Sequence, residues 1–360
     1  MFTATALVVG TAGTAHLAAT LNTVKRADTG TALTKKSSSL ATENYLVVGS
    51  DSRAGANPDS PDFGSIGAIG AAPGRRSDTI MVLRFNPKTG EAAILSIPRD
   101  LWVPIAGTGK SNRINSAYTK GNATLIDTIE QNLGIPINHF IDVDFYGFKD
   151  LVDALGGVTI FFDLPTRDKN TGLNIPTPGC VNLSGIDSLR YVRSRHFQQE
   201  VNGRWHEDQS SDFGRIARQQ DFIRKAATKA FSKASGDPLA VAQLVRAALK
   251  AVHPDATLNL QSMADRLSSL GRADIVTYTL PASGDRIGGA DVLRMDTAHA
   301  LPLLAFFGGK APPATPATSA PTTVAAGGSP PPPGGAASAT TAPPTSAPRG
   351  IVPDQTAKCG

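Results

Sequence analysis

Acidic and basic side chains gather where two predicted strands follow each other in the sequence. The motif GSDSR places Asp51 and Arg53 at the end of one apolar run, and RRSDT places Arg76 and Asp78 at the start of the next. Carboxylates on adjoining strand ends can meet in space. They suit Mg²⁺, which keeps several waters and takes further ligands from substrate phosphates. The alternative is that Asp51 and Asp78 only cap a turn or a strand.

A third cluster, SIPRDL, follows another apolar run. Pro98 ends the strand and fixes the direction of the chain, so Arg99 and Asp100 project from a rigid edge. An arginine beside a carboxylate can form a phosphate clamp with an adjacent base, in which Asp100 accepts the proton. The alternative is a surface ion pair, which is the commoner arrangement.

Residues 190–220 are rich in arginine, although the whole chain holds only 35 Lys and Arg against 30 Asp and Glu. Arg215 and Gln219 lie four residues apart on a predicted helix, with Arg218 near the same side. Arg193 and Arg195 come from the predicted helix before it. The six arginines of the segment are Arg190, Arg193, Arg195, Arg204, Arg215 and Arg218.

Arginines that converge from two helices favour a compact polyanion such as a pyrophosphate, because the guanidinium fork matches phosphate oxygens bidentately. One alternative is nucleic acid, but no helix-turn-helix or other reading element is apparent. The other is a solvated helix face, which is weakened because glutamate partners four residues earlier are scarce. The net charge of +5 and the isoelectric point near 9.2 are too modest to discriminate.

The elements that must position these side chains alternate between strand and helix, without internal repeats. Buried-strand patterns cover 44–53, 77–86, 91–100, 137–145, 158–162 and 274–282. Helical patterns cover a segment that Gly134 ends, and 147–157, 184–195, 211–231, 237–252 and 262–271. This alternation predicts one α/β or α+β domain over about residues 43–308.

The two ends of the chain differ from the middle. Residues 1–24 contain no Lys, Arg, Asp or Glu. We interpret them as a membrane signal-anchor whose cytoplasmic tail is missing, the alternative being a disordered or amphipathic amino terminus. Residues 25–42 are expected to form a linker, and residues 309–360 a Pro/Ala/Thr-rich disordered tail. Cys180 and Cys359 allow one disulfide or two unrelated thiols.

Several motifs, in this order, resemble the LytR-CpsA-Psr family: VVGSDSR, RSDTIMVLRFNPKTGEAAILSIPRDLWV, INSAY, IDVDFYGFKDLVDALGGV, LRYVRSRH and DFGRIARQQ. They span residues 43–232. The resemblance implies one catalytic domain with a central mixed sheet, flanking helices and a hydrophobic lipid-binding pocket. It implies a single-pass protein of the cell membrane with an extracytoplasmic domain. Such enzymes transfer glycopolymers from a polyprenyl-pyrophosphate carrier to peptidoglycan with Mg²⁺.

Carried over position by position, the resemblance makes Asp51 and Asp78 the metal ligands and Asp100 the base beside Arg99. The muramic acid C6 hydroxyl would attack the phosphorus nearer the sugar, and polyprenyl phosphate would leave. The residues expected to contact the pyrophosphate are Arg53, Arg76, Arg99, Arg193, Arg195, Arg215, Arg218 and Gln219.

One segment departs from the family pattern. Residues 197–211, FQQEVNGRWHEDQSS, are longer and more polar than the loop usual there, so Arg204, Trp205 and His206 receive no role. Many relatives carry a C-terminal accessory domain where this chain has the Pro/Ala/Thr tail. Candidates for lining the lipid pocket are Leu125, Ile129, Phe148 and Leu151, the alternative being ordinary core.

Other functions stay open at this point. A pyrophosphatase acting on the same lipid carrier needs the same arginines and Mg²⁺, and it differs only in using water as the acceptor. A DNA-binding regulator is the third function considered, although we expect no nucleic acid among the partners. The sequence does not identify the polymer, because teichoic acid, capsule and arabinogalactan are all linked to the carrier through a pyrophosphate. The Pro/Ala/Thr-rich tail and the cysteines slightly favour arabinogalactan as the transferred polymer.

Overall fold

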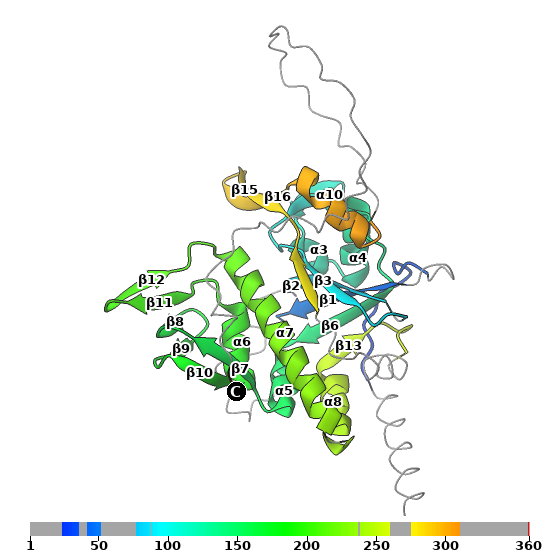
Figure 1. Ribbon diagram of the computed structural model, residues 1–360. Helices are drawn as coiled ribbons and strands as arrows, with labels where there is room; N and C mark the ends of the chain where they lie inside the picture. The colour runs from blue at the N-terminus through cyan, green and yellow to red at the C-terminus, as the bar shows by residue number, and fades with distance from the viewer. Residues whose placement is uncertain are drawn as a thin grey trace, which may run out of the picture.

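A six-stranded mixed sheet lies at the centre of the computed structural model, which describes residues 24–35, 42–51, 77–86, 88–236, 238–259, 275–309 and 359 (Figure 1). The strands, in spatial order, are β13 (Val252–Pro254), β6 (His139–Asp144), β1 (Glu43–Ser50), β2 (Ser77–Phe85), β3 (Ala92–Ser96) and β14 (Val276–Thr279). β1 runs parallel to β6 and antiparallel to β2, and β3 runs antiparallel to β2 and parallel to β14. The ends of β1, β3 and β6 and the start of β2 therefore share one edge. The predicted fold class, a mixed sheet flanked by helices, is confirmed.

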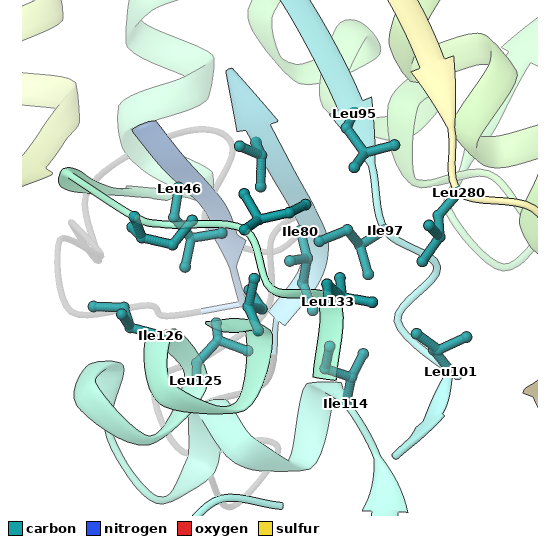
Figure 2. Close-up of a cluster of buried hydrophobic side chains, with 14 of the residues drawn as sticks. Leu46, Ile80, Leu95, Ile97, Leu101, Ile114, Leu125, Ile126, Leu133 and Leu280 are labelled. Atoms are coloured by element: carbon teal, nitrogen blue, oxygen red, sulfur yellow. The ribbon is translucent and has the colours of Figure 1, made fainter. Parts of the chain in front are cut away.

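The alternation of side chains along β1 explains the layers on either side of the sheet. Leu46 and Val48 are fully buried in the main apolar cluster. Figure 2 shows Leu46 among the side chains of this cluster. That cluster also receives side chains from α3 (Asn115–Thr119), α4 (Asn122–Leu133) and α10 (Thr297–Phe306). Tyr45 belongs to a second cluster, which includes Leu249 from α8 (Pro238–Ala251). Two apolar faces thus hold helices on both sides of the sheet.

Three further helices stand beside the sheet edge where the polar clusters lie. They are α5 (Phe145–Leu155), α6 (Gly185–Arg193) and α7 (Asp212–Gly236). Asp144, the last residue of β6, caps α5 by accepting a 2.7 Å hydrogen bond from the backbone N–H of Gly147. The predicted helices 184–195 and 211–231 correspond to α6 and α7.

Short strands build most of what the sequence did not predict. A four-stranded sheet has the order β12-β11-β8-β9, from β12 (Arg204–Glu207), β11 (Gln198–Val201), β8 (Thr166–Asp168) and β9 (Leu173–Ile175). Two-stranded sheets join β7 (Val158–Phe162) to β10 (Gly179–Leu183), β4 (Trp102–Ile105) to β5 (Lys110–Arg113), and β15 (Ala282–Ile287) to β16 (Ala290–Met295). Of these strands, only β7 was predicted.

The segment without an assigned role, residues 197–211, holds the β11–β12 hairpin. Its turn is formed by Asn202 and Gly203, with φ values of 52° and 75°. Positive φ at both central residues is the requirement of a type I′ turn, which Asn-Gly satisfies best. The hairpin projects beside α6 and α7 (Figure 1).

The described ends of the chain are attached to the domain. Ala27 bridges Asp255, and Thr34 donates a 2.5 Å hydrogen bond to Glu130 in α4, so residues 24–35 of the expected linker lie against the domain. Cys180 and Cys359 form a disulfide, which decides between the two alternatives.

Several predictions concern residues outside the described ranges. The expected anchor (1–24), apart from Val24, lies outside the described residues. So do the predicted helix 262–271 and the expected tail (309–360), apart from Gly309 and Cys359. Within the described ranges, no helix combines the length and the apolar character needed to cross a membrane.

Candidate active site

The predicted Asp78 and Arg99 meet at the shared edge of the sheet. Asp78 is the second residue of β2, and Arg99 follows β3 after Pro98. The backbone N–H of Ile97 donates to the carbonyl of Ile80, which carries the β2–β3 pairing up to this point. The guanidinium of Arg99 donates to a carboxylate oxygen of Asp78. Both side chains are about four-fifths buried, with 17% and 24% exposed, so a ligand can still reach the pair.

Asp100 lies among three arginines. Its carboxylate oxygens are 3.7 Å from Nε of Arg99, 3.5 Å from Nε of Arg113 and 3.5 Å from Nη2 of Arg195. Arg113 also donates a 2.7 Å hydrogen bond to the carbonyl of Asp291 in β16. Arg113 directly precedes the motif INSAY, and nothing in the sequence predicted that β5 would bring it beside Asp100.

The start of α7 brings a second carboxylate into the network. Asp212 lies 2.5 Å from Nη2 of Arg215 and 3.5 Å from Nε of Arg195. Burial lowers the pKa of the Arg215 guanidinium. The nearby charge of Arg99 lowers it further, whereas Asp212 and Asp78 act in the opposite direction. Arg99 after β3, Arg195 after α6 and Arg215 in α7 are therefore linked into one charged cluster. Asp212 was not among the predicted site residues.

Arg218 occupies a different place from the one expected. Its side chain is 0% exposed, and its guanidinium pairs with Asp208 at 2.8 Å and donates to the carbonyl of Ser194 at 2.9 Å. It also lies over the ring of Phe197, 4.4 Å from the centroid. The base of the β11–β12 hairpin covers this side of α7. In the structure Arg218 therefore holds the segment that carries Arg195, and protein groups enclose its guanidinium.

Gly214 permits the contact between α7 and this segment. A Cβ atom at Gly214 would lie 2.3 Å from a carboxylate oxygen of Asp208 and 2.4 Å from the hydroxyl of Ser210. Only a residue without a side chain allows that approach. Burial alone would raise the pKa of Asp208, but hydrogen bonds from Ser210 and Arg218 bring it below its usual range.

A buried carboxylate also fixes the backbone around Arg195. Asp168 accepts hydrogen bonds from Ser194 Oγ at 2.6 Å and from the backbone N–H groups of Arg195 and His196 at 3.2 and 3.1 Å. Burial would raise the pKa of Asp168, but hydrogen bonds from the Ser194 hydroxyl and from the backbone N–H groups of Asn170, His196 and Thr171 lower it below its usual range. The carboxylate is therefore ionised at neutral pH and holds this turn.

The remaining predicted residues lie around this cluster. Gln219 donates to Thr79 Oγ1 at 3.0 Å and to the carbonyl of Val192 at 2.9 Å, which attaches α7 to β2 and to α6. The guanidinium of Arg193 lies 4.2 Å from the ring centroid of Phe145, at the start of α5. Arg53 and Arg76 lie outside the described residues.

Asp51 reaches the same corner as Asp78 through the strand register. Ser50 pairs with Ser77, so the residues that follow β1 lie beside the start of β2. Within the described ranges, no three His, Cys, Asp or Glu side chains come together as a metal cage. Two carboxylates fit a Mg²⁺ that takes its other ligands from water and from a phosphate-bearing substrate.

A charged cluster of this kind, on one edge of a mixed sheet, is typical of α/β domains that bind a compact polyanion. The comparison with known families identifies the domain more closely. The model of the LytR_cpsA_psr family matches residues 7–304, and the chain therefore belongs to this family.

Curated relatives match the central part of the chain. The polyisoprenyl-teichoic acid–peptidoglycan teichoic acid transferase TagU of Bacillus cereus is 37% identical over 173 residues, which cover 47% of this chain and 53% of TagU. The probable cell wall biosynthesis protein LcpB of Corynebacterium glutamicum is 37% identical over 182 residues, which cover 50% of this chain and 40% of LcpB. The chain thus spans about half the length of the curated relatives it matches.

Solved structures share the fold over a longer stretch. A LytR-Csp2A-Psr enzyme from Actinomyces oris superposes with a TM-score of 0.63 and 26% identity, covering 80% of this chain and 97% of that one. TagV of B. subtilis gives a TM-score of 0.57 at 24% identity, covering 74% of this chain and 95% of TagV. The second likeness concerns the fold alone.

Proposed function

We propose that the protein transfers a glycopolymer from a polyprenyl-pyrophosphate carrier to peptidoglycan and releases polyprenyl phosphate. The observation that carries this proposal is the convergence of Arg99, Arg195 and Arg215 on the carboxylates of Asp78, Asp100 and Asp212, from three separate elements. Membership of the family, and the name of the related TagU, support glycopolymer transfer as the reaction.

In the proposed site the arginines hold the pyrophosphate and stabilise the charge that grows on the leaving phosphate. Phosphoryl transfer depends chiefly on positioning and on charge stabilisation, and an arginine offers several N–H donors in a planar fork. We assign these contacts to Arg53, Arg76, Arg99, Arg193, Arg195 and Arg215, with Gln219 beside them. Arg218 enters the proposal as a positioning residue, because its contacts hold the segment that carries Arg195.

We assign Asp100 as the base that takes the proton from the acceptor hydroxyl. Its side chain is 17% exposed and lies within 3.7 Å of three guanidinium groups. A carboxylate so placed can accept the proton of a hydroxyl that it contacts. The muramic acid C6 hydroxyl would attack the phosphorus nearer the sugar of the donor. The bond from that phosphorus to the oxygen of the departing polyprenyl phosphate would then break.

Asp51 and Asp78 would hold Mg²⁺ together with oxygens of the pyrophosphate. The ion supplies neutralisation of charge on the phosphate oxygens when it is bound. Asp78 is paired with Arg99, so a phosphate bound by this guanidinium would lie beside a carboxylate that could hold the ion. If Mg²⁺ has this role, its removal by a chelator should leave binding of the lipid-linked donor intact and abolish transfer.

We also propose that the domain lies outside the cytoplasm beside the membrane, where an apolar pocket takes the polyprenyl chain. Ile97 and Leu101 of the main apolar cluster flank Arg99 and Asp100, so apolar side chains border the charged site. Of the expected lining residues, Leu125 and Ile129 are fully buried in that cluster, and Phe148 contacts Phe222 at a ring distance of 5.5 Å. These three side chains pack within the domain, and Leu151 is half-buried.

The test supplies a lipid-pyrophosphate-linked sugar, peptidoglycan and Mg²⁺ to the full chain in detergent. Arg99→Ala and Arg193→Ala are expected to lower the rate of transfer about 100-fold, the usual effect of losing one donor to a developing oxyanion. Arg190→Ala is the matched control, because Arg190 pairs at 2.9 Å with Asp187 on the surface of α6. Wild-type rates in both site variants would refute the assignment of the site. Exclusive release of the sugar phosphate into water would favour the pyrophosphatase.

A further inference from the structure

The β11–β12 hairpin and its neighbour β8 carry a row of polar and aromatic side chains next to the site. We call this row the hairpin face and define it as Arg167, His196, Gln198, Trp205 and Glu207. Gln198 lies opposite both Arg167 on β8 and Glu207 on β12, so the three side chains share one face of the sheet. Trp205 lies two residues before Glu207 on β12 and therefore on the same face.

Side-chain contacts join the hairpin face into one ordered surface. Arg167 Nε donates to Gln198 Oε1 at 2.9 Å, and Gln198 Nε2 donates to Glu207 Oε2 at 3.4 Å. His196 Nδ1 lies 2.8 Å from Glu207 Oε1. The guanidinium of Arg167 covers the indole of Trp205, 3.8 Å from the ring centroid. The row is nevertheless accessible, since the side chains of His196 and Glu207 are 54% and 38% exposed.

The base of the hairpin fixes this face relative to the active site. His196 is the next residue after Arg195, and both backbone N–H groups donate to the buried carboxylate of Asp168. At the other end Asp208, the next residue after Glu207, pairs with Arg218. Arg195 also contacts Asp100, so the hairpin face begins one residue from the arginine that touches the proposed base.

The chemistry of the hairpin face matches a chain of sugar rings. A pyranose presents C–H groups on its faces, which pack on an indole, and hydroxyl and amide groups at its rim. Planar carboxylate, amide, guanidinium and imidazole groups bind such a rim with paired hydrogen bonds. Arg167 is accompanied on this face by Glu207 and by Glu200, which lies opposite Trp205, so the row is not built for a polyanion such as nucleic acid.

We propose that the hairpin face binds the glycan strand of peptidoglycan and presents its hydroxyl to Asp100. This inference rests on the proposed transferase function, because only a transferase needs a sugar acceptor in place of water. The acceptor is favoured over the sugars of the donor because the face leads to Asp100, whereas the donor is placed by its pyrophosphate among the arginines.

The direct test is the Kd of a peptide-free tetrasaccharide of alternating N-acetylglucosamine and N-acetylmuramic acid, measured by calorimetry on the full chain without donor. Trp205→Ala and Glu207→Gln are expected to weaken binding about tenfold, the effect of losing one important side chain of an interface. Trp205→Phe keeps an aromatic ring and should retain most of the affinity. His206→Ala is the matched control, because His206 lies on the same strand but on the opposite face, and it should leave the Kd within about twofold of wild type.

The kinetic arm separates the inference from the function on which it rests. With the lipid-linked donor, Trp205→Ala should raise KM for the glycan acceptor and leave KM for the donor unchanged, and loss of the contact with Arg167 should lower the melting temperature by no more than about 4 °C. No tetrasaccharide binding by the wild type, equal losses in Trp205→Ala and His206→Ala, or a raised donor KM would overturn the inference. Failure of the wild type to consume the donor would instead overturn the proposed function, whatever the tetrasaccharide does.

Discussion

Replacing Asp208 by asparagine tests whether the buried ion pair under the hairpin holds the site together. The side chains of Arg218 and Asp208 are 0% and 4% exposed, and their charged atoms lie 2.8 Å apart. Removal of one charge from a buried pair leaves the other uncompensated and costs about 3–5 kcal/mol. The asparagine oxygen can still accept the hydrogen bond that Ser210 donates to Asp208, so we expect about 3 kcal/mol.

The assay is equilibrium unfolding in urea with the disulfide intact. At a slope of about 3 kcal/mol/M, a loss of 3 kcal/mol lowers the midpoint by about 1 M. Asp150→Asn is the control, because Asp150 is 66% exposed and pairs with Lys149 at 3.6 Å on the surface. Its midpoint should fall by less than about 0.3 M. Equal midpoints for the two variants would refute the view that Arg218 is a buried structural arginine.

Three further predictions use other contacts. Gly214→Ala should lower the urea midpoint about as much as Asp208→Asn, and the double variant should lose little more, because both changes break the same pair. Burial would raise the pKa of Asp255, but hydrogen bonds, the strongest from His139, lower it to about 2. The ionised carboxylate therefore contributes stability above about pH 4, and this stability is lost as the pH falls toward 2. The melting temperature of Asp255→Asn should accordingly depend less on pH between about 4 and 2 than that of the wild type. Cys180→Ser removes a cross-link between residues 179 apart and should lower the free energy of unfolding by about 5 kcal/mol in the chain-entropy model, as dithiothreitol should in the wild type.

The central strands and the main helices could be predicted from the sequence because their apolar runs are long and end at clear stops. The pattern in residues 77–86 became β2, and the one in residues 211–231 became the larger part of α7. The shared sheet edge then explains why Asp78, Arg99 and Asp100 come together, since strands that pair side by side must present their ends at one place.

The hairpin in residues 197–211 was missed although a signal was present. The sequence VNGRW contains Asn202 and Gly203, the residue pair that most strongly favours a two-residue hairpin turn. The strands beside it are short and polar, and strand periodicity is weak over four residues. They are held by pairing with β8 and by the Asp208–Arg218 pair at the base of the hairpin, which are contacts distant in sequence.

The different place of Arg218 could not be foreseen from helix spacing. Arg215 and Arg218 lie three residues apart and share one side of a helix. The hairpin base, with Asp208 and Phe197, covers one of them, whereas Arg215 stays beside Asp212 at the site. Arg113 was missed for a related reason: it ends β5 and its partner, Asp100, precedes β4, so they meet only when the β4–β5 hairpin forms.

The central claim is that the phosphate nearer the sugar moves from the lipid carrier to a glycan hydroxyl. The most direct measurement is the ³¹P NMR spectrum of the products from a lipid-pyrophosphate-linked sugar, peptidoglycan glycan and Mg²⁺. We predict a phosphodiester between sugar and glycan, formed in equal amount with polyprenyl phosphate, and its loss in Arg99→Ala. A sugar phosphomonoester in place of the phosphodiester, with the glycan unmodified, would contradict the account.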